Sequence, residues 1–355
     1  MPRISIDFLK DLIAAPSPSG YEQPVARLYR DHVTPFADEV RTDVLGNVTA
    51  ILNPQAEMKV MLAAHMDEIG FIIHHIGPDG LLYFSPIGGH DATTPLGQRV
   101  WVHGRSRLPG VVGRKAIHLL DPSELERKPA MDDLWIDIGA TSHDEAAACV
   151  SLGDVVTFQY EYQPLMGERV VGRAFDNKAG ILIIAEALRM LRQEGGLDLN
   201  VGVYAVATVQ EEIGSRGAET AAYAIGPQSG LAVDMGQATD YRDATTSRYG
   251  KFDIGMGPAI DRGANTNHEV FRLLTEAVAE EQIDVQIHAT GSSTPTDARA
   301  LQVTRGGMAT GLLSVPLRYM HTPSEVISLK DVEATARLMA AYCRRITPFT
   351  DFRPR

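Results

Sequence analysis

The sequence contains few cysteines and no surplus of basic residues. Cys149 and Cys343 are the only cysteines, and they form neither a CxxC pair nor a disulfide framework. The formal net charge is −12, and no block of lysine and arginine is present that could neutralise phosphates. The cysteine usage indicates a reducing compartment, and the charge argues against a nucleic-acid partner.

Long hydrophobic runs are also missing. No segment approaches the roughly 18 consecutive apolar residues of a membrane-spanning helix. Residues 1–20 have charged side chains inside their apolar stretch, which is typical of an amphipathic helix and not of a signal peptide. We therefore expect a cytoplasmic protein that does not bind membranes.

Several common catalytic motifs are absent as well. There is no HExxH segment, which excludes the zinc peptidases whose two histidines share one helix. There is also no GxSxG nucleophile elbow and no P-loop. Any active site must therefore be assembled from residues that lie far apart in the sequence.

The domain organisation follows from a change of pattern along the 355 residues, which are many for a single hydrophobic core. Residues 1–70 and 166–355 alternate helical patterns with apolar runs, which predicts an α/β domain with a sheet flanked by helices. Residues 71–165 contain short β-type runs separated by Gly, Pro and Asp, with one expected helix at 142–149. This middle part predicts a small inserted all-β barrel domain.

Local signals place the main elements of the α/β domain. Gly46-Asn47 between two β-type runs predicts a hairpin, and Ser328 is the expected N-cap of the last helix. We expect helices at 4–14, 22–33, 177–192, 215–225, 267–281 and 329–345, and strands at 201–209, 230–233, 285–289 and 309–315.

Metal-binding residue types follow several of the apolar, strand-like runs. The carboxyl ends of strands in an open α/β sheet meet along one edge, where ligands bind. Imidazole and carboxylate groups suit zinc, cobalt or manganese. The candidate ligands are His65, Asp176, Glu212, Asp234 and His321.

Each of these residues alone has a simpler explanation. An aspartate before a helix, such as Asp176, is usually an N-cap, and Asp234 resembles a turn residue. A single histidine at the end of a strand is more often structural than a ligand. Adjacent acids such as Glu211 and Glu212 are usually solvated, but here they follow an unbroken apolar run. The coincidence of all these positions favours one shared site.

Two histidines and three carboxylates are more than one catalytic zinc needs, because such a site has about three protein ligands. The set fits two divalent ions, zinc or cobalt, if one carboxylate bridges them. Asp176 is the expected bridge, because its loop can present both oxygens. Glu211, next to the ligand Glu212, is the candidate general base. Asp67 could accept the second N–H of His65 and fix its tautomer.

The segments HMDEIG, FDNKAG, QEEIG, VDM and MHTPSE resemble the tetrahedral-aminopeptidase family. This family of dinuclear metallo-aminopeptidases includes the glutamyl aminopeptidases and some members labelled endoglucanase. The resemblance covers nearly the whole chain. It implies one metal held by His65, Asp176 and Asp234, and a second held by Asp176, Glu212 and His321. It also implies that Glu211 is the catalytic base and that Asp67 orients the first histidine.

The resemblance further implies that the protein removes N-terminal residues from peptides. The β domain would be a dimerisation domain, and the dimers would assemble into a hollow tetrahedral dodecamer. One segment departs from the family pattern. In residues 291–302, GSSTPTDARALQ, the Thr296-Asp297-Ala298 part matches, but Ser293-Thr294-Pro295 replaces flexible glycines.

Other functions remain open at this stage. An N-acyl deacylase could use the same metals and the same base. A glycoside hydrolase needs two carboxyl groups about 5–9.5 Å apart and no histidines, so it leaves His65, His321 and Asp234 unexplained. A non-enzymatic relative with a decayed site would not need to retain every ligand and the base.

Overall fold

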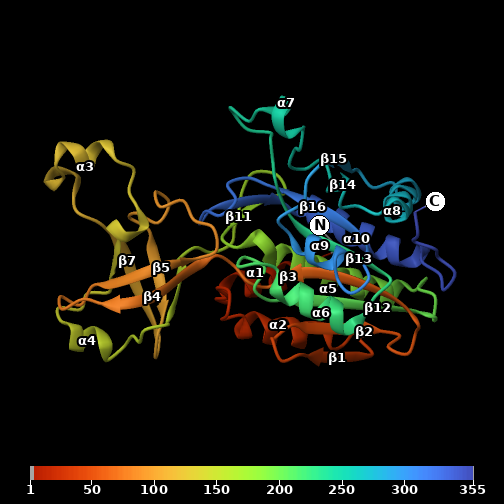
Figure 1. Ribbon diagram of the computed structural model, residues 1–355, viewed down its shortest axis with the longest axis horizontal. Coiled ribbons are helices and arrows are strands. Elements are labelled where there is room, and N and C mark those ends of the chain that lie inside the picture. Colours follow the sequence, from red (N-terminus) through yellow and green to blue (C-terminus); the bar gives the residue numbers. More distant parts are fainter. Residues whose placement is uncertain (1–3, 355) are drawn as a thin grey trace. The chain divides into compact units, whose positions relative to one another are not determined.

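The computed structural model describes residues 4–354, which divide into two compact units. The α/β unit comprises residues up to 67, 161–320 and 324 onward, and the β-barrel unit comprises residues 68–160 and 321–323. The colours of Figure 1 show that the β-barrel unit comes from one stretch near the start of the chain, whereas the α/β unit comes from both ends. The predicted α/β sheet flanked by helices, with a small inserted all-β barrel, is confirmed.

The α/β unit is built on a sheet of eight strands. Their order is β1 (Glu39–Thr42), β2 (Val48–Leu52), β12 (Val201–Thr208), β3 (Met58–His65), β13 (Ser229–Gln237), β16 (Ala309–Leu317), β14 (Ala259–Gly263) and β15 (Gln286–Thr290). The central strands β12, β3, β13 and β16 are parallel to one another. Every residue of β12 is buried, as expected for a Val- and Ala-rich run covered on both faces.

Helices cover both faces of this sheet. One layer contains α1 (Ile6–Ala14), α2 (Gln23–Val33), α5 (Phe175–Glu194), α8 (His268–Glu281) and α10 (Leu329–Arg345). The other layer contains α6 (Arg216–Ile225) and α9 (Asp297–Gln302). Figure 1 shows α5 lying along the central strands. The helix α10 packs on α5 and buries Cys343 completely.

The local signals at the predicted hairpin and helix cap are confirmed. Strands β1 and β2 pair antiparallel around a turn in which the Asp43 side chain accepts the backbone N–H groups of Gly46 and Asn47. Ser328 caps α10 by accepting the Lys330 N–H at 3.3 Å. A short helix α7 (Thr246–Tyr249) and a second sheet of β10 (Gln163–Pro164), β11 (Arg169–Gly172) and β17 (Glu325–Ser328) complete the unit.

The β-barrel unit closes on itself through six strands. Their order is β4 (Gly70–Ile76), β5 (Leu82–Ile87), β8 (Trp135–Asp137), β7 (Arg107–Gly113), β6 (Arg99–His103) and β9 (Val155–Phe158). The strands enclose an apolar core whose largest members are Phe71, Phe84 and Phe158. Closure leaves no open sheet edge, which stabilises a small β unit.

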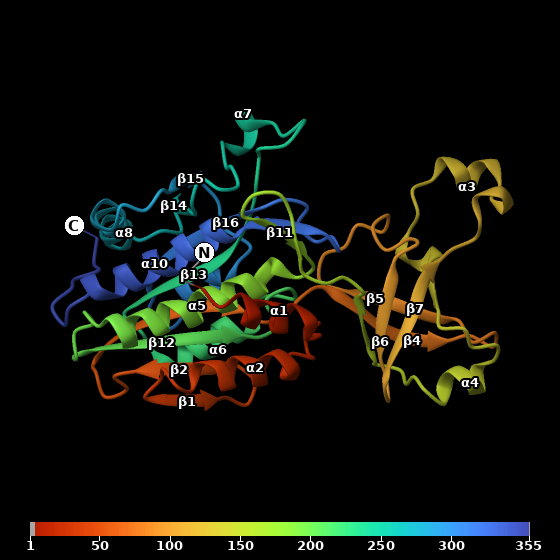
Figure 2. The same cartoon turned by 180° about the vertical axis from the view of Figure 1, so that it is seen from behind.

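One part of the β-barrel unit differs from the prediction. We expected a single helix there, at 142–149, and observe α4 at His143–Ala147. A second helix, α3 (Pro122–Glu126), and two short 3-10 helices lie between β7 and β8. Figure 2 shows α3 standing apart from the strands, and none of its residues is buried. Without a buried face it has no hydrophobic periodicity, and Asp121 followed by Pro122 is the remaining start signal.

Among the described residues, no helix is long and apolar enough to cross a membrane.

Candidate metal centre

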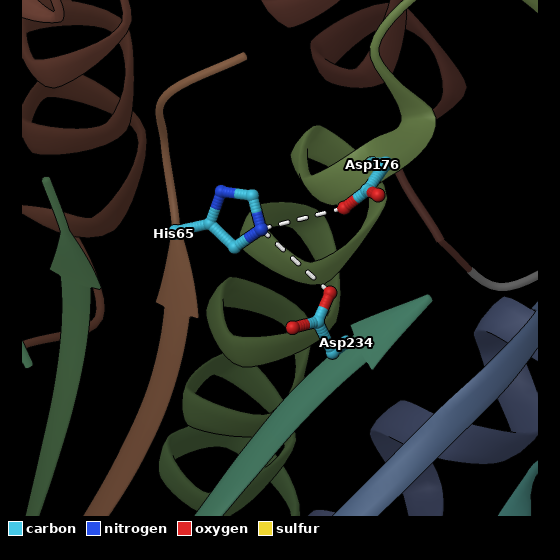
Figure 3. Close-up of side chains that lie close together, drawn as sticks. All are labelled: His65, Asp176 and Asp234. Atoms are coloured by element: carbon cyan, nitrogen blue, oxygen red, sulfur yellow. Dashed lines mark ion pairs between the residues drawn. The ribbon is translucent and has the colours of Figure 1, made fainter. Parts of the chain in front are cut away.

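His65 is the last residue of β3, and its imidazole is buried between two groups of acids. Its Nδ1 lies 3.0 Å from the backbone carbonyl oxygen of Asp67 and 3.4 Å from the Oδ1 atom of that residue. Its Nε2 lies 3.3 Å from Oδ1 of Asp176 and 3.6 Å from Oδ1 of Asp234, as Figure 3 shows. An N–H at Nδ1 that donates to the carbonyl leaves the lone pair of Nε2 directed at the two carboxylates.

Asp176 lies in the first turn of α5, where the backbone is not helical (φ −77°, ψ 101°) and the peptide bond to Asn177 is cis. The Asn177 side chain donates to the Val233 carbonyl at 2.9 Å, which fixes this turn against β13. The backbone N–H of Asp176 donates to Glu325 Oε2 at 3.1 Å. These bonds leave the Asp176 carboxylate facing His65.

Asp234 differs from the prediction, because it lies inside a strand and not after one. β13 continues to Gln237, since it pairs with β16 in parallel from Ser229 to Gln237. Position 234 therefore alternates onto the face that His65 shares. Oδ1 of Asp234 also accepts the Met235 N–H at 2.8 Å, which helps to orient the carboxylate.

The donor atoms of these three residues suit a divalent cation. One imidazole nitrogen and two carboxylate oxygens lie within 4.8 Å of one another, and all three residues are buried. Burial alone lowers the pKa of His65, but its bonds to Asp176, Asp234 and Asp67 outweigh this and hold the pKa well above its usual range. The acids therefore require a positive charge, which a metal ion between them would provide.

Glu211 and Glu212 lie in a tight turn between β12 and α6. Glu211 Oε2 is 3.9 Å from His65 Nε2, and its Oε1 accepts the hydroxyl of Ser215 at 3.2 Å. Burial raises the pKa of Glu211 to about 9, although His65 opposes this. Burial and the charge of Asp176 hold the pKa of Glu212 well above its usual range. Both acids thus belong to the same group of buried charges as the predicted ligands.

The structure gives Asp67 a wider role than the predicted one. The shorter contact of His65 is to the Asp67 carbonyl, whereas the carboxylate accepts the N–H groups of Glu211 at 3.0 Å and Glu212 at 3.1 Å. The same carboxylate accepts the Ser19 hydroxyl at 2.6 Å. Asp67 therefore orients the histidine through its backbone and the paired glutamates through its side chain.

His321 belongs to the short segment 321–323 of the β-barrel unit, beyond the end of β16 at Leu317. Its backbone is left-handed (φ 59°), and its Nδ1 lies 2.9 Å from the Gly89 carbonyl oxygen. That contact leaves Nε2 as the nitrogen that can bind a metal. Its membership of a second metal site stays a prediction.

Sequence reasoning assigned no role to three further residues near the glutamates. Glu22 and Asn47 accept backbone N–H groups of the turn that follows β12. Asp297, at the start of α9, is buried and accepts the Thr208 hydroxyl at 2.6 Å. Burial raises the pKa of Asp297 to about 7. Asn47 was interpreted only as a turn residue, and no local pattern indicates that Glu22 is buried.

A model of the family described as M42 glutamyl aminopeptidase matches residues 46–338. A lysyl aminopeptidase of Pyrococcus furiosus is 35% identical over 98% of this chain and 99% of its own length. A TET aminopeptidase structure from a marine-sediment Thaumarchaeota archaeon superposes with a TM-score of 0.92 at 31% identity, covering 97% of this chain and 96% of the other. The TET1 peptidase of Pyrococcus horikoshii, described as assembling into a tetrahedron or a large octahedral shell, gives 0.85 at 31%, covering 96% and 99%.

Proposed function

Since this chain belongs to the M42 glutamyl aminopeptidase family and is therefore a peptide hydrolase of the aminopeptidase class, we propose that its reaction takes place at His65, Asp176 and Asp234. The observation that supports this most directly is the convergence of their donor atoms within 4.8 Å, beside the carboxylate of Glu211. The substrate would be a peptide with a free N-terminus. The product would be its first amino acid.

Family membership implies divalent metal ions, and the donor set fits them. We assign His65, Asp176 and Asp234 to one ion, and Asp176, Glu212 and His321 to a second, with Asp176 as the bridge. Zinc or cobalt suits these ligands. When bound, two such cations supply positive charge that polarises a carbonyl group and makes water more acidic.

Glu211 is the proposed proton carrier. Its carboxylate is desolvated, so its pKa is high until positive charge in the site lowers it. Ionised in this way, Glu211 accepts a proton from the attacking water and delivers it to the leaving amine. The Ser215 hydroxyl holds one of its oxygens, and the other remains available for this transfer.

The alternatives are distinguished by substrate. An N-acyl deacylase would use the same residues on a blocked amine, and a glycoside hydrolase would leave the histidine unused. The relatives are named aminopeptidases, so neither alternative is favoured. The TET titles support a homo-oligomer, built from dimers joined through the β-barrel unit into a dodecamer. Light scattering of the purified protein measures this directly, and a monomer would contradict it. The cysteine usage supports a cytoplasmic location.

The proposed function is tested with chelated enzyme that is reloaded with zinc, cobalt or manganese. Aminoacyl p-nitroanilides with Lys, Glu, Leu and Ala side chains would be compared with their N-acetylated forms and with carboxymethylcellulose. Lys and Glu are included because the relative and the family description name them. We expect turnover of free-amine substrates only, and only after reloading. Turnover confined to the acetylated forms, or cellulose hydrolysis that survives chelation, would contradict the proposal.

A further inference from the structure

Four consecutive backbone N–H groups after β12 bind side chains instead of other backbone groups. Val209 N donates to Asn47 Oδ1 at 3.1 Å, and Gln210 N donates to Glu22 Oε1 at 3.2 Å. The next two N–H groups, of Glu211 and Glu212, donate to the two oxygens of Asp67 at 3.0 and 3.1 Å. We call Glu22, Asn47 and Asp67 the amide clamp.

The amide clamp begins where the sheet ends. The β2–β12 ladder stops at the pair Val48–Ala207, and the β3–β12 ladder stops at His65–Thr208. Asn47 is the residue before the first of these stops, and Asp67 comes two residues after the second. Side chains thus extend the hydrogen bonding of the sheet past its last residue, so that N–H groups in this half-buried turn keep their partners.

Glu22 comes from a different part of the chain, 188 positions before Gln210. It is the residue before α2, and its side chain is buried. Its Oε1 also accepts the Gly20 N–H at 2.8 Å, so one oxygen joins the N-terminal loop to the turn that bears the glutamates. Burial raises the pKa of Glu22 to about 7, and the nearby Asp67 charge adds to this. A buried acid in this place is unfavourable for folding alone.

Gln210 is the residue that most needs such a partner. Its φ of 56° lies in the left-handed region, which is uncommon for residues other than glycine and which clusters at functional sites. Rotation of the peptide unit before Gln210 would turn its N–H away from Glu22. That rotation would also change the direction in which the next residue, Glu211, projects.

We propose that Glu22 is a positioning residue, which holds the turn at Gln210 so that the Glu211 carboxylate points at the reaction site. Glu22 does not touch His65, Asp176 or Asp234 in any contact of the described residues, and it acts through the backbone. This inference rests on the proposed role of Glu211 as proton carrier.

The test compares three substitutions at Glu22 with one matched control. Glu22→Leu removes the acceptor, Glu22→Asp keeps the charge but shortens the side chain, and Glu22→Gln keeps an acceptor oxygen at the same reach. Asp331 is the control, because it is also a buried acid and also accepts two loop N–H groups, those of Gly255 at 2.6 Å and Gly257 at 2.8 Å. Asp331→Leu should lower stability as Glu22→Leu does.

We expect Glu22→Leu and Glu22→Asp to lower kcat by about 10- to 100-fold, as misplacement of a reacting group by about 1 Å does. KM and bound metal should stay within about twofold of wild type, since no substrate or metal contact is lost. Glu22→Gln should restore kcat to within about threefold, and Asp331→Leu should keep the wild-type value. Hydrogen exchange of the peptide covering residues 209–213 should become faster in Glu22→Leu and Glu22→Asp only.

Each other outcome is decisive. Wild-type kcat in folded, metal-loaded Glu22→Leu and Glu22→Asp would overturn the inference, and so would a defect in Glu22→Gln equal to theirs. A loss confined to metal content or KM would assign Glu22 to a different role. If Glu22→Leu does not fold, the pair Glu22→Asp and Glu22→Gln decides alone. Failure of the proposed function shows separately, as a wild-type enzyme without aminopeptidase activity, and hydrogen exchange then still tests whether Glu22 holds the turn.

Discussion

The two units place their charges in opposite ways. In the α/β unit, acids are buried at the ends of the central strands, and burial raises the pKa of Glu211, Glu212 and Asp234. In the β-barrel unit the core is apolar, and the acids with shifted pKa lie on or near the surface. There, hydrogen bonds lower the pKa, as the Thr141 N–H does for Glu145.

This difference shows which unit was built under a functional constraint. Buried like charges destabilise a fold, because each carboxylate loses its hydration and repels its neighbours. A stable fold does not need them, as the apolar core of the β-barrel unit demonstrates. The α/β unit therefore retains a destabilising cluster that becomes favourable once cations and substrate are bound.

The largest expected effect is the loss of the metal centre from the α/β unit. Asp176→Ala should lose both bound metals and all measurable turnover, because the proposed bridge is removed. Asp133→Ala in the β-barrel unit, which removes a surface acid paired with Arg127 at 2.7 Å, should keep both metals. Elemental analysis of the purified variants measures this. Two metals retained per chain in Asp176→Ala would refute the bridge.

Removal of the proton carrier should give the next largest effect. Glu211→Gln keeps the shape of the side chain but cannot accept a proton, so kcat should fall about 10²- to 10⁴-fold with both metals retained. The control is Glu219→Gln on the exposed face of α6. Steady-state kinetics and elemental analysis on the same samples decide the matter. Activity near wild type in Glu211→Gln would end the assignment.

The third prediction concerns pH and stability in chelated protein. The pKa of Asp297 is about 7 in the folded state and 3.8 as its ordinary value. Between these values the folded state keeps a proton that the unfolded chain has lost, so stability falls as the pH rises from about 4 to 7. Asp297→Asn removes this loss. Its stability relative to wild type should improve between pH 4 and pH 8 by an amount on the order of a few kcal/mol.

Urea unfolding at the two pH values measures this third effect. A relative stability that does not change with pH would show that the burial of Asp297 is not balanced by proton uptake. In the β-barrel unit the sign is reversed. The pKa of Glu145 is lowered in the folded state, so its contribution appears as the pH rises past its ordinary value and is lost in acid.

The smallest effect is expected at the surface of the β-barrel unit. Arg127→Ala breaks an exposed pair with Asp133 and should change the free energy of unfolding by no more than about 0.5 kcal/mol. Thermal or urea unfolding measures it. A loss of several kcal/mol would mean that this surface is covered in the assembled protein, and the contrast between the units would then need revision.

The sequence predicted the fold because hydrophobic pattern and local caps agree. The apolar run of β12, the hairpin at Asn47 and the cap at Ser328 each depend on neighbours within a few residues. The helix α3 was missed because it has no buried face and so no periodicity. The end of β13 was placed too early, because its last residues pair with β16 and depend on a distant strand.

The candidate site was predictable as a set of residue types, but its supporting contacts were not. His65, Asp176 and Asp234 could be named from strand-end chemistry, and the structure brings them together. The role of Asp67 carbonyl, and the bonds of Glu22 and Asn47 to the turn, connect residues more than a hundred positions apart. Such contacts leave no periodic signal, since each depends on one side chain reaching one distant backbone atom.

The placement of the two thiols makes the chain its own reporter of unfolding. Cys149 is exposed in the β-barrel unit, whereas Cys343 is fully buried in α10 and burial raises its pKa to about 12. A thiol reagent at neutral pH should modify the native protein once, at Cys149, which allows a single fluorophore to be attached without mutagenesis. A second, slower modification would time the opening of α10, and mass spectrometry would follow both events in one sample.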